Sequence, residues 1–338
     1  MRLSVLDQSV SCAGRDEADA LADTLDLAPW CEELGYERFW VSEHHGLPTI
    51  VGSAPEILMA AIAARTRRIR IGSAGVMLPH YSALKVAEQF GVLQALAPGR
   101  IDLGVGRAPG SDMRTALALN PNATHAAEQF PQQIVDLQAW TAGLRHQGIV
   151  AHPRPPAGAQ APEIWVLGSS DYGAQLAAHL GLPYAFAYFF MDGQGVEQAL
   201  ALYRSLYRPS ARHPQPQATI CVWALAAPTG EEARWHALSR ERWRIDRQRG
   251  VLGPLQAPQA IAERGFAPED LPAVEALRAR AFVGTAPEVG ARLRALAGEL
   301  QLDELVVNTW AHDPAARRTS YRLIAEEFGL PKTKPLRT

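Results

Sequence analysis

The feature that most constrains the fold is a regular alternation of short β-rich apolar segments with longer amphipathic helical segments. A strand-like segment that includes Phe39 is followed 30 residues later by one at Ile69, and 32 residues after that by one at Ile101. This spacing is typical of a βα unit, in which a helix connects two parallel strands. Eight strands are predicted, at residues 3–6, 38–41, 69–72, 101–105, 164–167, 184–188, 219–223 and 304–307.

Eight such alternations in 338 residues favour an α/β fold of the (β/α)8 barrel type over an open doubly wound sheet. We expect a single domain over residues 1–330 and a frayed tail at 331–338. Residues 124–141 are predicted to form one helix. Two segments are longer than a βα unit needs and contain several Pro or Gly residues, so they are predicted to be insertions. They are 144–162 and 250–281, and the second is a candidate lid.

Composition excludes several classes of protein. The chain carries 33 basic and 35 acidic side chains, so it lacks the basic surface that nucleic acids and anionic membranes require. Its three cysteines, Cys12, Cys31 and Cys221, lie far apart, which argues against a disulfide scaffold or a cysteine-based zinc site. The chain begins without the apolar core of a signal peptide and has no apolar stretch of about 20 residues. We therefore expect a cytoplasmic protein without a membrane span.

Two adjacent histidines are the candidate catalytic residues. In a (β/α)8 barrel the ligand-binding groups follow the carboxyl ends of the strands, and His44 and His45 follow the second strand. An imidazole in this place can act as an acid, a base or a hydrogen-bond donor, although a histidine there can also merely pack. The run from Glu43 to His45 also suggests a metal-dependent barrel hydrolase. The other strand ends offer few further ligands, so no metal is predicted.

A phosphate-binding site is predicted from the ends of the fourth and fifth strands. Arg107 directly follows the fourth strand, and a guanidinium group can bind a phosphate through two parallel hydrogen bonds. Gly168, Ser169 and Ser170 follow the fifth strand just before a helix, whose first backbone N–H groups attract anions. Each feature alone is consistent with an ordinary surface arginine or helix cap, but on neighbouring strands they predict a phosphate clamp.

Two other strand ends carry candidate ligand contacts. Ser73, Ala74 and Gly75, in the predicted loop after the third strand, are small enough for the backbone to approach a flat ligand closely. Small residues at these positions are also expected without a ligand, because space inside a barrel is limited. Tyr188 and Phe189 lie at the outgoing end of the sixth strand, where we expect them to line an apolar substrate pocket.

Several of these segments, in this order, resemble the bacterial luciferase-like monooxygenases, with the MsnO8-type single-chain subgroup as the nearest match. The resemblance covers most of the chain, is strongest over residues 1–115 and is weak over 205–280. It implies a (β/α)8 oxidoreductase, commonly homodimeric, that oxidises a small organic substrate. It also implies that reduced FMN, supplied by a separate NAD(P)H:flavin reductase, reacts with O2 through a C4a-peroxyflavin. The segments that carry it are 3–7, 39–45, 71–79, 86–89, 98–110 and 282–288.

The resemblance also implies roles for individual residues. His44 is expected beside the flavin, with His45 in the same active site. Residues 73–75 are expected against the isoalloxazine ring, often with a cis peptide bond between Ala74 and Gly75. Arg107, Ser169 and Ser170 fall on the phosphate-binding positions of the family.

One departure and two alternatives remain. Gly106 stands where bacterial luciferase has a reactive cysteine before the arginine, so light emission is not expected. Some barrels of this type bind the deazaflavin F420 and transfer hydride without O2, and a flavin-binding protein without turnover is the other alternative. We expect substrate specificity to arise from residues 108–122, from the end of the sixth strand and from 250–281.

Overall fold

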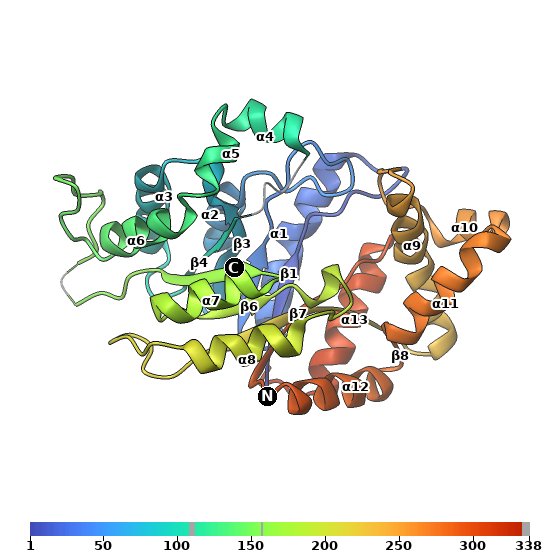
Figure 1. Cartoon of the computed structure of the whole chain (residues 1–338). Coiled ribbons are helices and arrows are strands. Elements are labelled where there is room, and N and C mark those ends of the chain that lie inside the picture. Colours follow the sequence, from blue (N-terminus) through green and yellow to red (C-terminus); the bar gives the residue numbers. More distant parts are fainter. Residues whose placement is uncertain (108–111, 157, 333–338) are drawn as a thin grey trace. The chain divides into compact units, whose positions relative to one another are not determined.

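The computed structural model describes residues 1–107, 112–156 and 158–332, in which strands and helices alternate along the chain (Figure 1). The strands are β1 Arg2–Asp7, β2 Arg38–Val41, β3 Arg70–Met77, β4 Ile101–Gly106, β5 Glu163–Gly168, β6 Tyr184–Phe186, β7 Ala218–Ala226, β8 Phe282–Gly284 and β9 Glu304–Asn308. The α-helices are α1 Glu17–Glu33, α2 Pro55–Arg65, α3 Ala83–Leu96, α4 Met113–Leu119, α5 Ala123–Ala126, α6 Phe130–Thr141, α7 Asp171–Leu180, α8 Val196–Leu206, α9 Gly230–Gln248, α10 Pro258–Arg264, α11 Leu271–Arg280, α12 Ala286–Glu299 and α13 Pro314–Glu327. Three short 3-10 helices are η1 Leu78–His80, η2 Tyr188–Phe190 and η3 Pro268–Asp270.

Strand pairing confirms the predicted (β/α)8 barrel. The hydrogen-bonded order is β6-β5-β4-β3-β2-β1-β9-β7-β8, and β6 is also paired with β7. The pairs whose register is defined are all parallel, as helical crossovers require. β8 is a strand of three residues beside the end of β7 and adds to the eight that were predicted. Sequence reasoning missed it because so short a segment shows no recognisable hydrophobic period.

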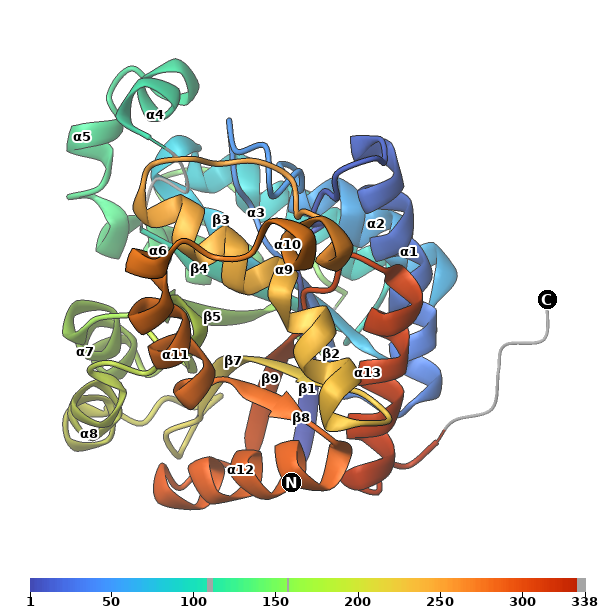
Figure 2. The same ribbon diagram turned by 90° about the vertical axis from the view of Figure 1, so that its right-hand side faces the viewer.

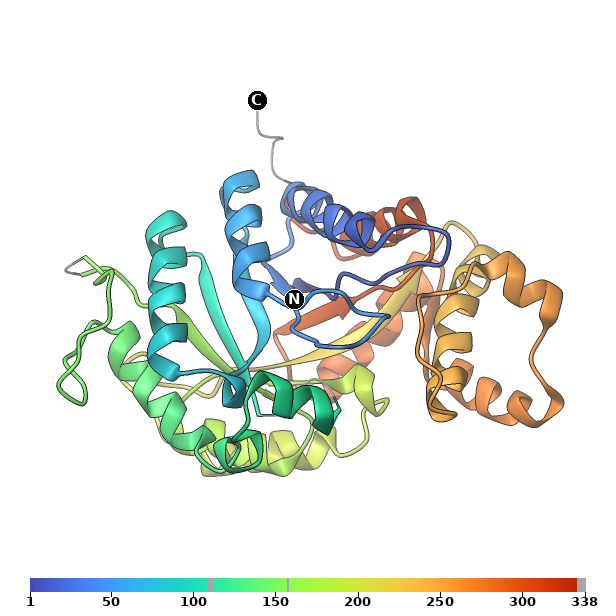
Figure 3. The ribbon, with the colours of Figure 1, turned by 90° about the horizontal axis from the view of Figure 1, so that it is seen from above.

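The chain divides into two compact units, which are described separately. The first comprises Met1–Glu37, Leu47–Val51 and Cys221–Thr338, and the second comprises Arg38–Gly46 and Gly52–Ile220. In the first unit, α10 and α11 lie beside α9 (Figures 2 and 3). In the second unit, α7 and α8 pack side by side (Figure 1). Every candidate site residue of the sequence analysis belongs to the second unit, and the single domain over 1–330 stays a prediction.

Three predicted elements differ from the observed ones, and one of them is β3, which runs to Met77 and does not end at residue 72. The helix expected over 124–141 is divided into α5 and α6, because Pro131 occupies the first turn of α6 and proline favours a helix start over a helix interior. The sixth strand ends at Phe186, two residues earlier than expected. The chain then turns into η2, where the Phe190 N–H donates to the Ala187 carbonyl at 3.2 Å.

The two predicted insertions differ in content. The described residues of 144–162 connect α6 to β5 and include no α-helix or strand, and residue 157 lies outside the described residues. Residues 250–281 contain α10, η3 and α11. The lid role of the second segment stays a prediction. Of the tail expected at 331–338, residues 333–338 lie outside the described residues. Within the described residues, no helix combines the length and apolarity needed to cross a membrane.

A buried carboxylate connects three strands of the second unit. Asp102 on β4 is fully buried, and its Oδ2 accepts hydrogen bonds from Arg38 Nη1 at 2.8 Å and from Trp40 Nε1 at 2.9 Å, both on β2. Its Oδ1 accepts one from Arg70 Nε on β3 at 3.0 Å. A buried carboxylate is stable only when it is paired and hydrogen-bonded in this way. The contacts therefore depend on the alignment of β2, β3 and β4.

Gly72 makes room for this cluster. It is the third residue of β3 and pairs with Trp40 on one side and Asp102 on the other. A Cβ atom at Gly72 would lie 2.6 Å from Trp40 Cδ1 and 2.8 Å from Asp102 Cβ, closer than real atoms pack. The absence of a side chain at this position therefore allows the indole and the carboxylate to meet.

Asp102→Asn should lower the free energy of unfolding by about 2 kcal/mol or more, because the buried Arg38 and the partly buried Arg70 each lose one of two carboxylate partners and keep Glu163. Urea unfolding followed by tryptophan fluorescence would measure the loss. Glu128→Gln, which removes an exposed carboxylate beside His125, is the control and should change the free energy by less than about 0.5 kcal/mol. Equal stability of the two variants would contradict the role given to Asp102.

Candidate functional site

The carboxyl ends of β2 to β6 lie along one edge of the parallel sheet in the second unit. Val41 pairs with Ser73, Met77 with Gly106 and Gly168 with Phe186, so neighbouring strands end near one another. The residues that follow these strands therefore meet at the same edge, where barrels of this type place their ligand-binding groups.

A buried carboxylate after β2 connects this strand with β3. Glu43 is 1% exposed, and its Oε1 lies 2.8 Å from His45 Nε2 and accepts a hydrogen bond from Tyr81 Oη at 2.8 Å. Its Oε2 accepts one from the Met77 backbone N–H at 3.1 Å. The three contacts join the loop after β2 to the end of β3 and to the residue after η1. Sequence analysis quoted Glu43 only as part of a possible metal motif.

Tyr81 is a site residue that sequence reasoning missed. It follows η1, and its hydroxyl donates to Glu43. Burial, followed by the negative charge of Glu43, raises the pKa of Tyr81 well above its usual value, so the hydroxyl stays protonated and remains a donor. A tyrosine after a strand gives little signal in sequence, because its contact with Glu43 depends on how β2 and β3 are aligned.

The structure places both predicted histidines in the loop after β2. The His44 backbone N–H donates to the Gly52 carbonyl at 3.0 Å, and both imidazoles are partly buried. The His45 ring contacts the His80 ring edge to face, with centroids 6.0 Å apart. The His80 ring meets that of Tyr81 at 6.2 Å in the same way. The structure thus groups His45, His80 and Tyr81, whereas the catalytic role of either predicted histidine stays a prediction.

Ser73, Ala74 and Gly75 lie inside β3, not in a loop after it as predicted. The register with β4 shifts between Ser73 and Val76, so this part of β3 forms an irregular, bulge-like segment that local patterning did not reveal. Ser73 Oγ donates to the Gly104 carbonyl at 2.8 Å and fixes the start of the irregularity. The peptide bond between Ala74 and Gly75 is cis, in agreement with the resemblance.

Gly75 permits close packing between β3 and its neighbours. A Cβ atom at this position would lie 2.8 Å from the Gly104 carbonyl oxygen and 2.6 Å from Leu167 Cδ1. Ala74 and Gly75 have no ladder partner on β4 among the residue pairs that define the register. The irregularity therefore places Ala74 and Gly75 outside the regular register of the β3–β4 ladder.

The residues of the predicted phosphate clamp meet at the start of α7. The Arg107 guanidinium carbon lies 4.0 Å from the ring centroid of Tyr172, the second residue of α7, in a cation–π contact. Ser170 is the N-cap residue and makes no side-chain capping bond, and both it and Ser169 are exposed. The Ser170 carbonyl accepts a hydrogen bond from Tyr184 Oη at 3.3 Å. The structure thus brings Arg107 to the same helix start as the two serines.

Tyr188 and Phe189 are partly buried in η2, beyond the end of β6. A Cβ atom at Gly193 would lie 2.3 Å from the Tyr188 ring, so this ring packs directly against the glycine backbone. Whether the two aromatic side chains line a substrate pocket stays a prediction. In the loop expected to contribute to specificity, residues 108–111 lie outside the described residues.

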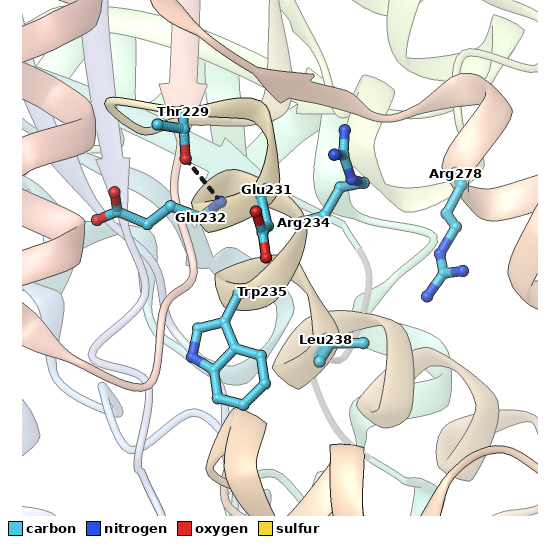
Figure 4. Close-up of a pocket in the computed structure, with 7 residues that line it drawn as sticks. All are labelled: Thr229, Glu231, Glu232, Arg234, Trp235, Leu238 and Arg278. Atoms are coloured by element: carbon cyan, nitrogen blue, oxygen red, sulfur yellow. Dashed lines mark hydrogen bonds between the residues drawn. The ribbon is translucent and has the colours of Figure 1, made fainter.

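The first unit contains a separate surface cavity of about 450 Å³ beside α9 and α11 (Figure 4). None of the candidate site residues of the sequence analysis lines it. Its lining residues are Thr229, Glu231, Glu232, Arg234, Trp235, Leu238 and Arg278. Among the described residues, no group of three or more His, Cys, Asp or Glu side chains is arranged to hold a metal ion.

Comparisons with known proteins identify relatives that span nearly the whole chain. Residues 1–300 match the family model described as luciferase-like monooxygenase. A luciferase-like monooxygenase of Escherichia coli K12 is 39% identical, and the match covers 95% of each chain. The N-acetyl-S-alkylcysteine monooxygenase of Bacillus subtilis is 37% identical, with 96% of this chain and 98% of the relative covered. The crystal structure of apo-MsnO8 is 35% identical and superposes with a TM-score of 0.91 over 98% of this chain and 99% of that one.

Two more distant structures share the fold. The oxygenating constituent of 3,6-diketocamphane monooxygenase from Pseudomonas putida, in complex with FMN, is 19% identical with a TM-score of 0.74, and the match covers 97% of each chain. An F420-dependent secondary alcohol dehydrogenase is 13% identical with a TM-score of 0.66, with 96% of this chain and 98% of that one covered. Proteins of this fold thus include an FMN complex and an F420-dependent enzyme.

The raised pKa of Tyr81 predicts a change in stability at alkaline pH. Above about pH 10 the unfolded chain loses the phenolic proton that the folded protein keeps. The stability that Tyr81 contributes is therefore complete below that pH and is lost as the pH rises toward the folded-state pKa. Tyr81→Phe should remove this contribution, so the unfolding free energy should fall less steeply above pH 10 than in the wild type. Urea unfolding at several pH values would measure both slopes.

The control is Tyr172→Phe, which removes an exposed hydroxyl and should keep the wild-type slope. Equal slopes for wild type and Tyr81→Phe would show that the hydroxyl is not held by the buried carboxylate.

Proposed function

Because this chain belongs to the luciferase-like monooxygenase family, we propose that it is a flavin-dependent monooxygenase that uses reduced FMN and O2 to oxidise a small organic substrate. We choose a phosphorylated cofactor because Arg107 contacts Tyr172 in the first turn of α7. It brings a cation to a helix start with uncapped N–H groups, and this combination favours an anion such as a phosphate.

The residues at this edge of the sheet fit both ends of FMN. Arg107, Ser169 and Ser170, together with the first N–H groups of α7, would hold the phosphate. A flat ring requires the backbone to approach it closely. We propose that the ring lies against Ala74 and Gly75, in the part of β3 where the register with β4 is irregular. A side chain larger than hydrogen at Gly75 would collide with β4, which supports a role in packing this stretch tightly.

Reduced FMN, when bound, supplies the electrons that activate O2 for transfer of one oxygen atom to the substrate. The residues of this chain would orient the cofactor and control protons and water. We propose that His44 and His45 hold or move a proton beside the ring, and that Tyr188 and Phe189 keep water out. Exclusion of water limits the loss of oxidising equivalents as hydrogen peroxide.

The remaining parts of the proposal follow from the family. Its members commonly receive reduced flavin from a separate NAD(P)H:flavin reductase, and we propose the same supply for this protein, as a cytoplasmic homodimer. The substrate class to assay first is an N-acetyl-S-alkylcysteine, because a relative of that name is 37% identical over nearly the full chain.

Binding of FMN and of riboflavin, which lacks the phosphate, would test the clamp directly. We expect the wild type to bind reduced FMN about 10- to 100-fold more tightly than reduced riboflavin, the range expected for one or two charge-assisted hydrogen bonds. Arg107→Met should remove most of this difference by weakening FMN alone. Anaerobic fluorescence titration would give the dissociation constants.

Arg154→Met, which changes an exposed arginine of the loop before β5, is the control and should keep the preference for FMN. Equal binding of FMN and riboflavin by the wild type would exclude the clamp. Binding of F420 without binding of reduced FMN would replace the proposal by hydride transfer.

Oxygen incorporation would test the reaction. With reduced FMN, ¹⁸O2 and N-acetyl-S-methylcysteine, we expect a product heavier by one ¹⁸O atom in mass spectrometry, because a monooxygenase transfers one atom of O2. Oxidation of bound reduced FMN to FMN with all of the O2 reduced to hydrogen peroxide, in the presence of this and other thioethers, would instead favour a flavin-binding protein without substrate turnover.

A further inference from the structure

The Glu43 carboxylate limits the proton arrangement of His45. A carboxylate accepts hydrogen bonds and cannot donate them, so each group around it must donate. The Met77 backbone N–H can only donate to Oε2, and the Tyr81 hydroxyl stays protonated and donates to Oε1. The His45 Nε2 atom, 2.8 Å from the same Oε1, must therefore carry a proton.

Protonation of Nε2 gives the other ring nitrogen a defined role. In a neutral imidazole with a proton on Nε2, Nδ1 carries a lone pair and can accept a proton. No described residue forms a hydrogen bond with Nδ1 of His45, and the side chain is 12% exposed. The carboxylate and the imidazole thus form a dyad with one nitrogen anchored and one nitrogen open to a reacting group.

We propose that His45 transfers protons in this site through Nδ1, and that Glu43 is the positioning residue that fixes the tautomer and orientation of His45. The proposal rests on the proposed monooxygenase function and assigns the proton-transfer role within it. The contact with the Glu43 carboxylate, at 2.8 Å, is made by His45. Tyr81 and the Met77 N–H hold the carboxylate in place, as a third group does in other carboxylate–imidazole pairs.

Replacement of Glu43 by glutamine would disturb this arrangement in a defined way. The amide has one acceptor oxygen, whereas the carboxylate accepts from donors on both oxygens. An amide N–H2 at the Oε2 position would face the Met77 N–H, donor against donor. With the oxygen there instead, the N–H2 group faces His45 Nε2, which can accept from it only after losing its own proton. Glu43→Gln should therefore shift His45 toward the tautomer protonated on Nδ1.

Nuclear magnetic resonance of the full chain labelled with ¹⁵N-histidine would test the tautomer without any cofactor. Long-range ¹H–¹⁵N spectra distinguish the two ring nitrogens, and loss of signals in His45→Gln identifies His45. We expect a neutral ring protonated on Nε2 in the wild type and a shift toward Nδ1 protonation in Glu43→Gln. Tyr81→Phe and the exposed change Glu128→Gln should keep the wild-type tautomer. A wild-type ring protonated on Nδ1, or an unchanged tautomer in Glu43→Gln, would overturn the proposal.

A second measurement follows proton transfer during oxidation of the loaded protein. Oxidation of anionic reduced FMN by O2 in the absence of substrate consumes one proton, as FMNH⁻ + O2 + H⁺ → FMN + H2O2. We expect His45→Ala to slow this oxidation by about 100-fold and added imidazole to restore part of the rate. Glu43→Gln should slow it by about 10-fold without rescue by imidazole, because its imidazole is still present. The dissociation constant for reduced FMN should change little in both variants.

The two measurements separate the inference from the function on which it rests. Absence of FMN binding by the wild type would refute the proposed cofactor, while the tautomer would still report on the dyad. Normal FMN binding with an unchanged oxidation rate in His45→Ala would refute the proton-transfer role and leave the flavin-dependent function standing.

Discussion

The second unit depends on a carboxylate that is buried where water cannot solvate it. Asp102 on β4 is held by Arg38 and Trp40 from β2 and by Arg70 from β3. The cost of burying this charge is offset only while all three strands keep their alignment, so the contacts favour one register over its neighbours. Gly72 contributes by leaving the space that these side chains occupy.

The same alignment organises the other end of these strands. Five residues beyond Gly72, the β3 backbone ends at Met77, whose N–H meets the second buried carboxylate, Glu43. Glu43 lies just after β2, and Asp102 lies within β4. Each carboxylate joins neighbouring strands through charge-assisted hydrogen bonds. The first pairing is structural, whereas the second includes a histidine that can exchange protons. The aligned strand ends thus position the residue to which we assign proton transfer.

Sequence reasoning succeeded where the signal is local and failed where it depends on distant contacts. The strand–helix period, and the places where strands end, follow from short-range hydrophobic patterning, so the edge that carries His45, Arg107 and Ser170 could be predicted. The extension of β3 through residues 73–77 could not, because its irregularity arises from pairing with β4. Tyr81 could not be predicted for a similar reason, since its hydroxyl reaches a carboxylate 38 residues away in the chain.

By itself, the sequence determined that parallel strands would bring a set of polar and basic residues to one edge, because βα connections leave all carboxyl ends on the same side. Its motifs also indicated the family and a phosphate-bearing flavin cofactor. The tertiary structure alone decided which of these side chains touch. Arg107 lies on Tyr172, and Glu43 anchors His45, because strand register and burial select among contacts that the order of residues leaves open.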